Sequence, residues 1–254
     1  MSADVLSVEL AGGILTLTLD RPEKRNALNG TLIDALHDQL DRADVDADVR
    51  VVVVRGAGKD FCAGADLAEL LASADQSPEE NAHGAMHLGE LFVKMRALPK
   101  PVVAMVEGRA LAGGCGLATA CDLVIAHAES RFGYPEIQRG FVPAMVMAML
   151  RRAVTEKVAF DLVGTGRVLS AQEALEVGLV SRIVAADRFE DEAAAIAVGL
   201  AGASGTALAL IKQQLYAIDG LGFEDAIRLG AQVNATARAT PDFKAAVRQF
   251  LEKK

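Results

Sequence analysis

Two short apolar runs constrain the fold of this chain more than any other feature of its sequence. Residues 49–54 contain five valines and Arg50, and residues 101–106 contain three valines with Pro, Ala and Met; neither run shows regular alternation between apolar and polar residues. Such runs are typical of strands buried on both faces of a parallel sheet. Parallel strands need crossover connections, and residues 66–72 and 82–98, between the two runs, have helical spacing. The sequence therefore predicts an α/β domain.

Strands and helices are distributed unevenly along the chain. The first part contains a strand pair around Gly12-Gly13 over residues 5–20, a helix over 29–42 capped by Asn29 or Thr31, and a buried strand over 123–126. Beyond about residue 170 nearly every segment has helical spacing: 171–178, 187–200, 207–218, 223–237 and 242–252. We therefore expect a helical C-terminal region that packs against another subunit, because it is more apolar than a solvated tail requires.

Charge and cysteine content exclude several classes of protein. The 254 residues include 34 acidic and 26 Lys or Arg side chains, a net charge of −8, so neither nucleic acid nor an anionic membrane is an expected partner. An anionic ligand would have to meet a local basic cluster. The three cysteines have no CxxC spacing, which argues against a disulfide framework or a zinc site. With no basic leader before an apolar stretch, the sequence predicts a cytoplasmic protein.

Several familiar motifs are absent or incomplete. Residues 55–59, RGAGK, lack the spacing of a phosphate-binding P-loop, and the chain contains neither GxGxxG nor GxSxG. His83, His87 and Glu90 share one face of a predicted helix and could bind a metal, but no further ligand is evident. A partly solvated helix face is the favoured interpretation, and no metal is expected.

Two glycine-rich segments each follow a predicted buried strand. They are residues 61–67, FCAGADL, and residues 108–117, GRALAGGCGL. Small residues there allow close backbone approach and leave N–H groups unpaired where a helix begins. Two N–H groups from neighbouring loops can point at one atom and form an oxyanion hole. The alternatives are a tight strand-to-helix connection with Asp66 as N-cap, and glycines that merely permit close helix packing.

Glu136 lies within RFGYPEI, residues 131–137, among aromatic and apolar side chains. Desolvation there would raise the pKa of its carboxyl group and suit it to general acid–base catalysis. The alternative is a structural glutamate in the first turn of a helix that begins at Pro135, stabilised by the helix dipole. The residues alone leave the two interpretations about equally supported.

Taken together, these segments resemble the crotonase, or enoyl-CoA hydratase/isomerase, family. The matching segments follow the family order over nearly the whole chain: residues 19–28, 59–67, 99–108, 112–117, 121–126, 132–136 and 170–180. The resemblance implies a spiral of ββα units over residues 1–190 that binds acyl-CoA. It also implies a helical oligomerisation region over residues 191–254, holding a homotrimer or a dimer of trimers.

The resemblance also implies roles for individual residues. The backbone N–H groups of Ala65 and Gly113 would bind the thioester oxygen, and Glu136 would be the catalytic acid/base. Coenzyme A enters as part of the substrate, so no separate cofactor is expected. The residues implied in substrate binding are Lys24 and Arg25 near the CoA phosphates, Ala27, Ala63, Asp66 and Leu67 along the adenine and pantetheine path, and Phe250 and Lys253 near the C-terminus, reaching CoA from a neighbouring subunit.

Gly116 is the main departure from the family pattern, because hydratases of the family usually carry a second glutamate there. Two carboxylates can activate a water between them, whereas one can move a proton from C2 to C4 of an enoyl chain. Because hydration is the commonest activity of the family, the resemblance implies hydration of 2-enoyl-CoA to 3-hydroxyacyl-CoA in fatty acid metabolism. The alternative is Δ3–Δ2 enoyl-CoA isomerisation, which the single Glu136 favours. A CoA-ester binding protein without turnover is a weaker alternative. Residues 142–147 also depart from the family, and Met145 and Met147 are expected to reshape the acyl pocket.

Overall fold

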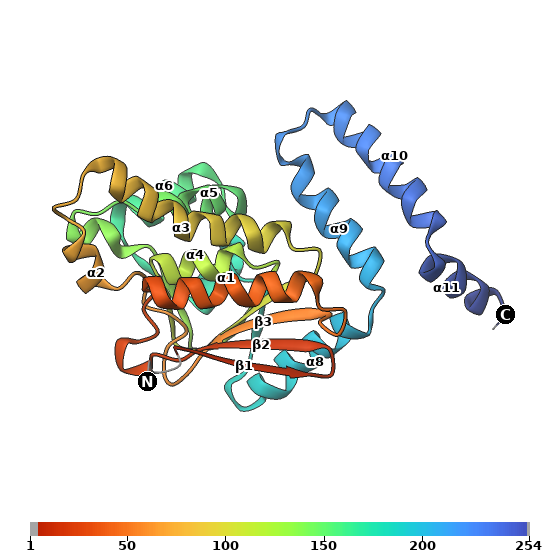
Figure 1. Cartoon of the computed structure of the whole chain (residues 1–254), viewed down its shortest axis with the longest axis horizontal. Helices are drawn as coiled ribbons and strands as arrows, with labels where there is room; N and C mark the ends of the chain where they lie inside the picture. Colours follow the sequence, from red (N-terminus) through yellow and green to blue (C-terminus); the bar gives the residue numbers. More distant parts are fainter. Residues whose placement is uncertain (1–4, 253–254) are drawn as a thin grey trace.

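A six-stranded sheet forms the centre of the molecule in the computed structural model, which describes residues 5–252 (Figure 1). Its spatial order is β1-β2-β3-β4-β6-β9, with β1 antiparallel to β2 and all other pairs parallel. The strands are β1 Leu6–Ala11, β2 Ile14–Leu19, β3 Val51–Gly56, β4 Val102–Val106, β6 Leu123–His127 and β9 Arg182–Val184. The predicted hairpin and the three predicted buried strands are present. The prediction missed β9.

A second, three-stranded sheet has the order β5-β7-β8, formed by β5 Arg109–Leu111, β7 Arg131–Gly133 and β8 Val168–Ser170. Along the chain β4 and β6 enter the large sheet, and β5 and β7, which follow them, enter the small one. Each strand pair is followed by helical segments, as expected for a spiral of ββα units. The segment 108–117 was expected to be a glycine-rich loop. In the structure it contains strand β5 and the start of a helix at Gly113.

The helices of the body follow the sequence signals closely. Asn29 caps the first helix by accepting a hydrogen bond from the backbone N–H of Leu32 at 3.0 Å. Ser77 and Glu80 form a reciprocal capping box on the longest one. The helices are α1 Gly30–Val45, α2 Leu67–Ala72, α3 Pro78–Ala97, α4 Gly113–Ala120, α5 Ala144–Ala153, α6 Glu156–Thr165 and α7 Ala171–Val177, with short 3-10 helices η1 Pro22–Lys24, η2 Pro135–Arg139, η3 Ala186–Arg188 and η4 Ile218–Gly220.

Strand β3 shows why the apolar runs lack alternation. Val52 and Val54 join the large core beneath α1 and α3, whereas Val51 and Val53 join a smaller core on the opposite face of the sheet. That second core is closed by α8, Phe189–Gly202, whose Phe189 and Ala193 are buried (Figure 1). Each fully buried valine contributes roughly 1.5–3 kcal/mol, so both faces of β3 stabilise the fold.

Three helices lead away from the body at its C-terminal end and are called the C-terminal arm here: α9 Gly205–Ala217, α10 Phe223–Ala239 and α11 Pro241–Glu252 (Figure 1). Neither α10 nor α11 contains a buried residue. The arm is fastened through α9, where the ammonium of Lys212, only 6% exposed, lies 2.7 Å from the Asp122 carboxylate. Tyr216 donates a further hydrogen bond to Asp122.

The division into residues 1–190 and 191–254 stays a prediction. Helix α8, which lies almost wholly beyond residue 190, packs on the sheet as part of the body. Among the described residues no single helix is long and apolar enough to cross a membrane. Residues 186–202 and 205–220 meet the criteria of length and composition only as a pair bent by 101°.

Candidate active site

The two glycine-rich segments lie against each other in the structure. Cys62 donates its backbone N–H to the carbonyl of Arg109 at 3.0 Å, and Leu111 donates to the carbonyl of Cys62 at 2.9 Å. On its other side the first segment pairs with the chain that follows β2: Leu28 donates to the carbonyl of Gly64 at 2.8 Å. The segment at 61–66 is therefore held between two others, and its geometry is set by backbone hydrogen bonds.

The amides of Ala65 and Gly113 meet at the contact between these segments. A Cβ atom added to Gly113 would lie 3.6 Å from the nitrogen of Ala65, and one added to Gly64 would lie 3.4 Å from the nitrogen of Gly113. Gly113 is the first residue of α4, so its N–H has no acceptor within the helix. Within residues 5–252 neither N–H donates a hydrogen bond. Two unpaired donors therefore lie side by side.

Backbone conformation at two neighbouring residues makes this approach possible. Ala112, the N-cap of α4, has φ of 51°, an unusual value for a residue with a Cβ, and it turns the chain from β5 into α4. Gly64 has φ of 105°, and a side chain there would meet the Cβ of Ala112 at 2.7 Å. The glycine is thus required by both its conformation and its neighbour.

Glu136 lies on η2, close to the two amides. The carbonyl of Gly133, three residues earlier, accepts a hydrogen bond from the N–H of Ala112 at 2.8 Å. The Glu136 side chain is 9% exposed, and its Oε2 atom is buried without a hydrogen-bond partner among the described residues. Burial raises the pKa of the carboxyl group, as its apolar surroundings predicted. Pro135 does begin a helical turn here, as the structural interpretation expected. The role of Glu136 as catalytic acid/base stays a prediction.

The space beside Gly116 is filled. A Cβ atom added to this glycine would lie 2.1 Å from a methyl group of Val146 on α5 and 3.6 Å from the ring of Phe92 on α3. No second carboxylate can enter there unless Val146 moves. Met145, expected to shape the acyl pocket, lines a groove of about 380 Å³ between α3, α5 and α9 together with Phe92 and Met149.

Most of the residues implied in substrate binding come together. Lys24 and Arg25 are exposed, and the carbonyl of Arg25 accepts a hydrogen bond from Ala63 at 3.0 Å. Asp66 caps α2 through the N–H of Ala68, and the next residue, Leu67, is 57% exposed. Ala27 is buried beside them. These residues belong to two hydrogen-bonded segments on either side of Ala65, and Lys24 and Arg25 are an exposed cationic pair among them.

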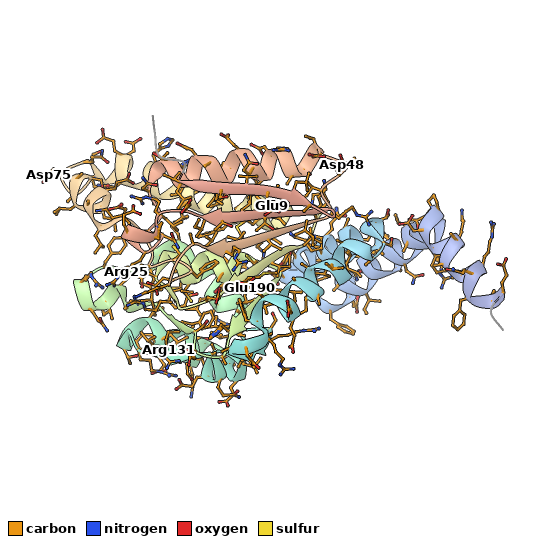
Figure 2. All side chains as sticks on the ribbon, turned by 90° about the horizontal axis from the view of Figure 1, so that it is seen from below. Glu9, Arg25, Asp48, Asp75, Arg131 and Glu190 are labelled. Carbon is orange, nitrogen blue, oxygen red and sulfur yellow. The ribbon has the colours of Figure 1, made fainter. Side chains whose placement is uncertain are left out.

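The C-terminal residues are the exception. Phe250 lies on α11, near the end of the arm, whereas Arg25 lies at the end of the body away from the arm (Figure 2). Phe250 therefore does not join the surface around Ala65 within one chain. Lys253 lies outside the described residues.

Two buried polar residues of this region were missed by the sequence analysis. Asn26 is fully buried in a left-handed conformation, and its amide donates to the carbonyls of Ala57 at 2.9 Å and Asp60 at 2.7 Å. Tyr134, also fully buried, shares a hydrogen bond of 3.0 Å with Thr119 of α4 and so ties η2 to that helix. The position of Asn26 just after a turn that begins with proline could have predicted its left-handed conformation, because Asn tolerates that conformation. No sequence feature of Tyr134 predicted its hydrogen bond to Thr119.

The cysteine and histidine side chains of the described residues show neither a reactive thiolate nor a metal site. Cys115 is buried beside Gly113, and its burial raises the pKa of the thiol to about 11, with a smaller contribution from the charge of Glu136, so the thiol stays protonated at neutral pH. His87 pairs with Asp34 at 2.7 Å and stacks on His37. Over the part of the chain that the structure describes, no group of three or more His, Cys, Asp or Glu residues is arranged to hold a metal.

Comparisons with known proteins agree with this architecture. The family model for enoyl-CoA hydratase/isomerase matches residues 9–254. A provisionally named enoyl-CoA hydratase of Thermus thermophilus is 45% identical over 243 residues, 96% of each chain. The 2,3-dehydroadipyl-CoA hydratase of Escherichia coli is 35% identical, over 95% of this chain and 93% of its own.

Solved structures give the same result. The enoyl-CoA hydratase of Mycobacterium smegmatis superimposes with a TM-score of 0.95 at 33% identity, covering 99% of this chain and 98% of that one. Human enoyl-CoA hydratase domain-containing protein 3 gives a TM-score of 0.93 at 30% identity, covering 98% of both chains. The fold is therefore the crotonase fold. The chain belongs to the enoyl-CoA hydratase/isomerase family and is an enzyme of that family.

Proposed function

We propose that the protein adds water to the 2,3 double bond of a 2-enoyl-CoA thioester, with Glu136 as the only carboxylate that moves protons. The observation that carries this proposal is the combination of two neighbouring, unpaired amides with the buried Oε2 of Glu136, which has no hydrogen-bond partner among the described residues. The names of the relatives support hydration as the type of reaction. The exposed Lys24–Arg25 pair supplies the local positive charge that the phosphates of CoA require on an acidic protein.

In the proposed reaction the oxygen of a water molecule bonds to C3 while the Glu136 carboxylate accepts its proton. The electron pair of the double bond moves through C2 onto the thioester oxygen, where the N–H groups of Ala65 and Gly113 stabilise the negative charge. One such donor contributes about 3–4 kcal/mol in related acyl-transfer enzymes. Glu136 then gives the proton to C2, and the enolate collapses to the 3-hydroxyacyl product. A raised pKa suits a group that both accepts and returns a proton.

Isomerisation is the second candidate, and the contact between Gly116 and Val146 favours it. Because Val146 fills the place of a second carboxylate, Glu136 has no partner with which to hold a water. A single carboxylate can remove a proton from C2 of a 3-enoyl-CoA and deliver it to C4, without water. The same two amides would stabilise the intermediate enolate.

Two substrates and one variant separate these candidates. Hydration of a short 2-enoyl-CoA removes the absorbance of the conjugated thioester, whereas isomerisation of a 3-enoyl-CoA creates it. Loss of absorbance with the first substrate, abolished in Glu136→Gln, would support hydration. Gain with the second and inertness toward the first would replace it by isomerisation. Binding of both esters without turnover would contradict both and leave a CoA-ester binding protein.

The C-terminal arm supports assembly as a homotrimer or a pair of trimers. Large apolar side chains of the arm are exposed in the described chain, and they include Ile211, Leu215, Phe223, Ile227, Val247 and Leu251. Because Arg25 and α11 lie at opposite ends of the molecule, Phe250 and Lys253 would reach CoA bound to a neighbouring copy (Figures 1 and 2). Sedimentation analysis tests the assembly, since a monomer at micromolar concentration would exclude it.

A further inference from the structure

Arg21 joins two segments of the site that are far apart in the sequence. Its guanidinium group is only 12% exposed. Nη1 donates to the carbonyl of Ala27 at 2.5 Å, and Nη2 donates to the carboxylate of Asp66 at 2.9 Å. One side chain therefore holds the segment after β2 and the segment that precedes α2. A planar guanidinium suits this task because its donors have fixed directions toward two acceptors.

These two contacts flank the short backbone bridge that positions Ala65. Leu28, next to Ala27, donates to the carbonyl of Gly64 at 2.8 Å, and Asp66, next to Ala65, donates to the carbonyl of Leu28 at 2.8 Å. Arg21 thus donates hydrogen bonds to Ala27, which precedes Leu28, and to Asp66, which follows Ala65. Any shift between the two segments would have to break one of these hydrogen bonds.

The direction of the Ala65 N–H follows from the same bridge. The carbonyl of Gly64 and the N–H of Ala65 belong to one planar trans peptide, so they point in opposite directions. Because the carbonyl is held toward Leu28, the N–H is held away from it, on the side where Gly113 lies. A rotation of this peptide would turn the N–H away from the amide of Gly113.

We propose that Arg21 is a positioning residue that aligns the Ala65 N–H with the Gly113 N–H for binding of the thioester oxygen. The inference rests on the proposed function, in which these two amides form the oxyanion hole. Arg21 does not touch the reacting atoms. Its effect passes through Ala27, the Leu28–Ala65 bridge and Asp66.

The test uses a bound chromophore that reports on the oxyanion hole. The thioester 4-dimethylaminocinnamoyl-CoA absorbs at longer wavelength when hydrogen bonds polarise its carbonyl. In Arg21→Met we expect the ester to bind, most of the red shift to be lost, and kcat to fall about 10- to 100-fold, as for small misalignments of catalytic groups. KM should change less than about threefold, because the N–H groups bind the charged enolate oxygen more strongly than the thioester carbonyl of the bound ester. Arg21→Lys should recover part of the shift, since an ammonium group reaches one acceptor.

Arg55→Met is the matched control. Arg55 is also a partly buried arginine, 27% exposed, and it forms tertiary ion pairs with Glu190 of α8 and with Glu107 after β4. It contacts neither the segment after β2 nor the segment that precedes α2. We expect this variant to lower thermal stability and leave the red shift intact. If Arg21→Met does not fold, Asp66→Asn gives the same test, because the one oxygen of Asn can still cap α2, whereas the NH2 group that replaces the other oxygen cannot accept a hydrogen bond from Arg21.

The outcomes separate the two hypotheses. A full red shift and full kcat in Arg21→Met, with only stability reduced, would overturn the positioning role and leave the oxyanion hole standing. A wild-type protein that binds the chromophore without any red shift would overturn the oxyanion hole itself, and the role of Arg21 with it. Loss of the shift in Arg21→Met but not in Arg55→Met would support the inference.

Discussion

The body and the C-terminal arm differ in the kind of group that the folded chain leaves without a partner. In the body, backbone hydrogen bonds and buried side chains fix the two glycine-rich segments and Glu136, and the described residues of the site leave two amides and one carboxylate oxygen unpaired. Exposed apolar side chains occur in both regions, with Val45 of α1 84% exposed and Phe223 of the arm 82% exposed, but only in the arm do two successive helices, α10 and α11, bury no described residue. Unpaired polar groups in a buried setting indicate chemistry, whereas uncovered apolar groups on a helix indicate a protein partner.

This contrast predicts that changes in the body alter the chemical step, while changes in the arm alter assembly. Each of the following experiments can confirm or break that separation.

The largest effect is expected from Glu136→Gln. The amide is close in size but cannot exchange protons, so we expect turnover to fall by about 10²–10⁴-fold, the usual contribution of general acid–base catalysis. Sedimentation should show an unchanged assembly. Turnover within a few-fold of wild type would show that another group moves the proton.

Gly113→Pro removes one oxyanion donor without removing a side chain. Proline is well tolerated at the first position of a helix, where the N–H has no acceptor in the helix. We expect kcat to fall about 10²–10³-fold. The control is Gly113→Ala, which keeps the N–H and whose Cβ would lie at ordinary contact distance, 3.5 Å from Leu28. Equal activity of the two variants would exclude this amide from catalysis.

Lys212→Met tests the attachment between body and arm. The variant leaves the Asp122 carboxylate without its buried partner, and breaking such a pair costs about 3–5 kcal/mol. Chemical denaturation should show this loss, together with weaker assembly. An unchanged midpoint would show that the ion pair does not hold α9 in place.

Phe223→Glu places a charge on the exposed apolar face of the arm. If this face is covered in the assembly, a central aromatic contributes about 2 kcal/mol or more, so dissociation should become roughly 30-fold easier. The melting temperature of the isolated chain should change little. Assembly that is unaffected by this charge would place the interface elsewhere.

The smallest effect concerns pH and the burial of Glu136. Its pKa is raised in the folded protein because burial disfavours the charged form. Folding therefore binds a proton, and the stability contributed by the neutral carboxyl is present at low pH and lost as pH rises through the raised pKa. The melting temperature of Glu136→Gln minus that of wild type should therefore be larger at pH 8 than at pH 4. The opposite sign would mean that the carboxylate has a partner in the folded state.

Local signals in the sequence were sufficient for much of the fold and for the position of the site. The valine runs identified β3 and β4 because a strand buried on both faces needs no polar alternation. The apolar neighbours of Glu136 predicted its burial and the direction of its pKa shift. In contrast, β5, β7, β8 and β9 have only three residues each, too few to show a period, and exist because neighbouring strands offer them hydrogen bonds.

The sequence by itself determined the longer strands and most of the helices, the two glycine-rich segments where amides are left unpaired, and the apolar setting of one glutamate. These are properties of neighbours along the chain. Only the tertiary structure decided that Val146 fills the space beside Gly116, thirty residues away, and that Arg21 reaches Asp66, forty-five residues away. Such contacts leave no local pattern, because they depend on how packed elements bring distant residues within a few ångströms of one another.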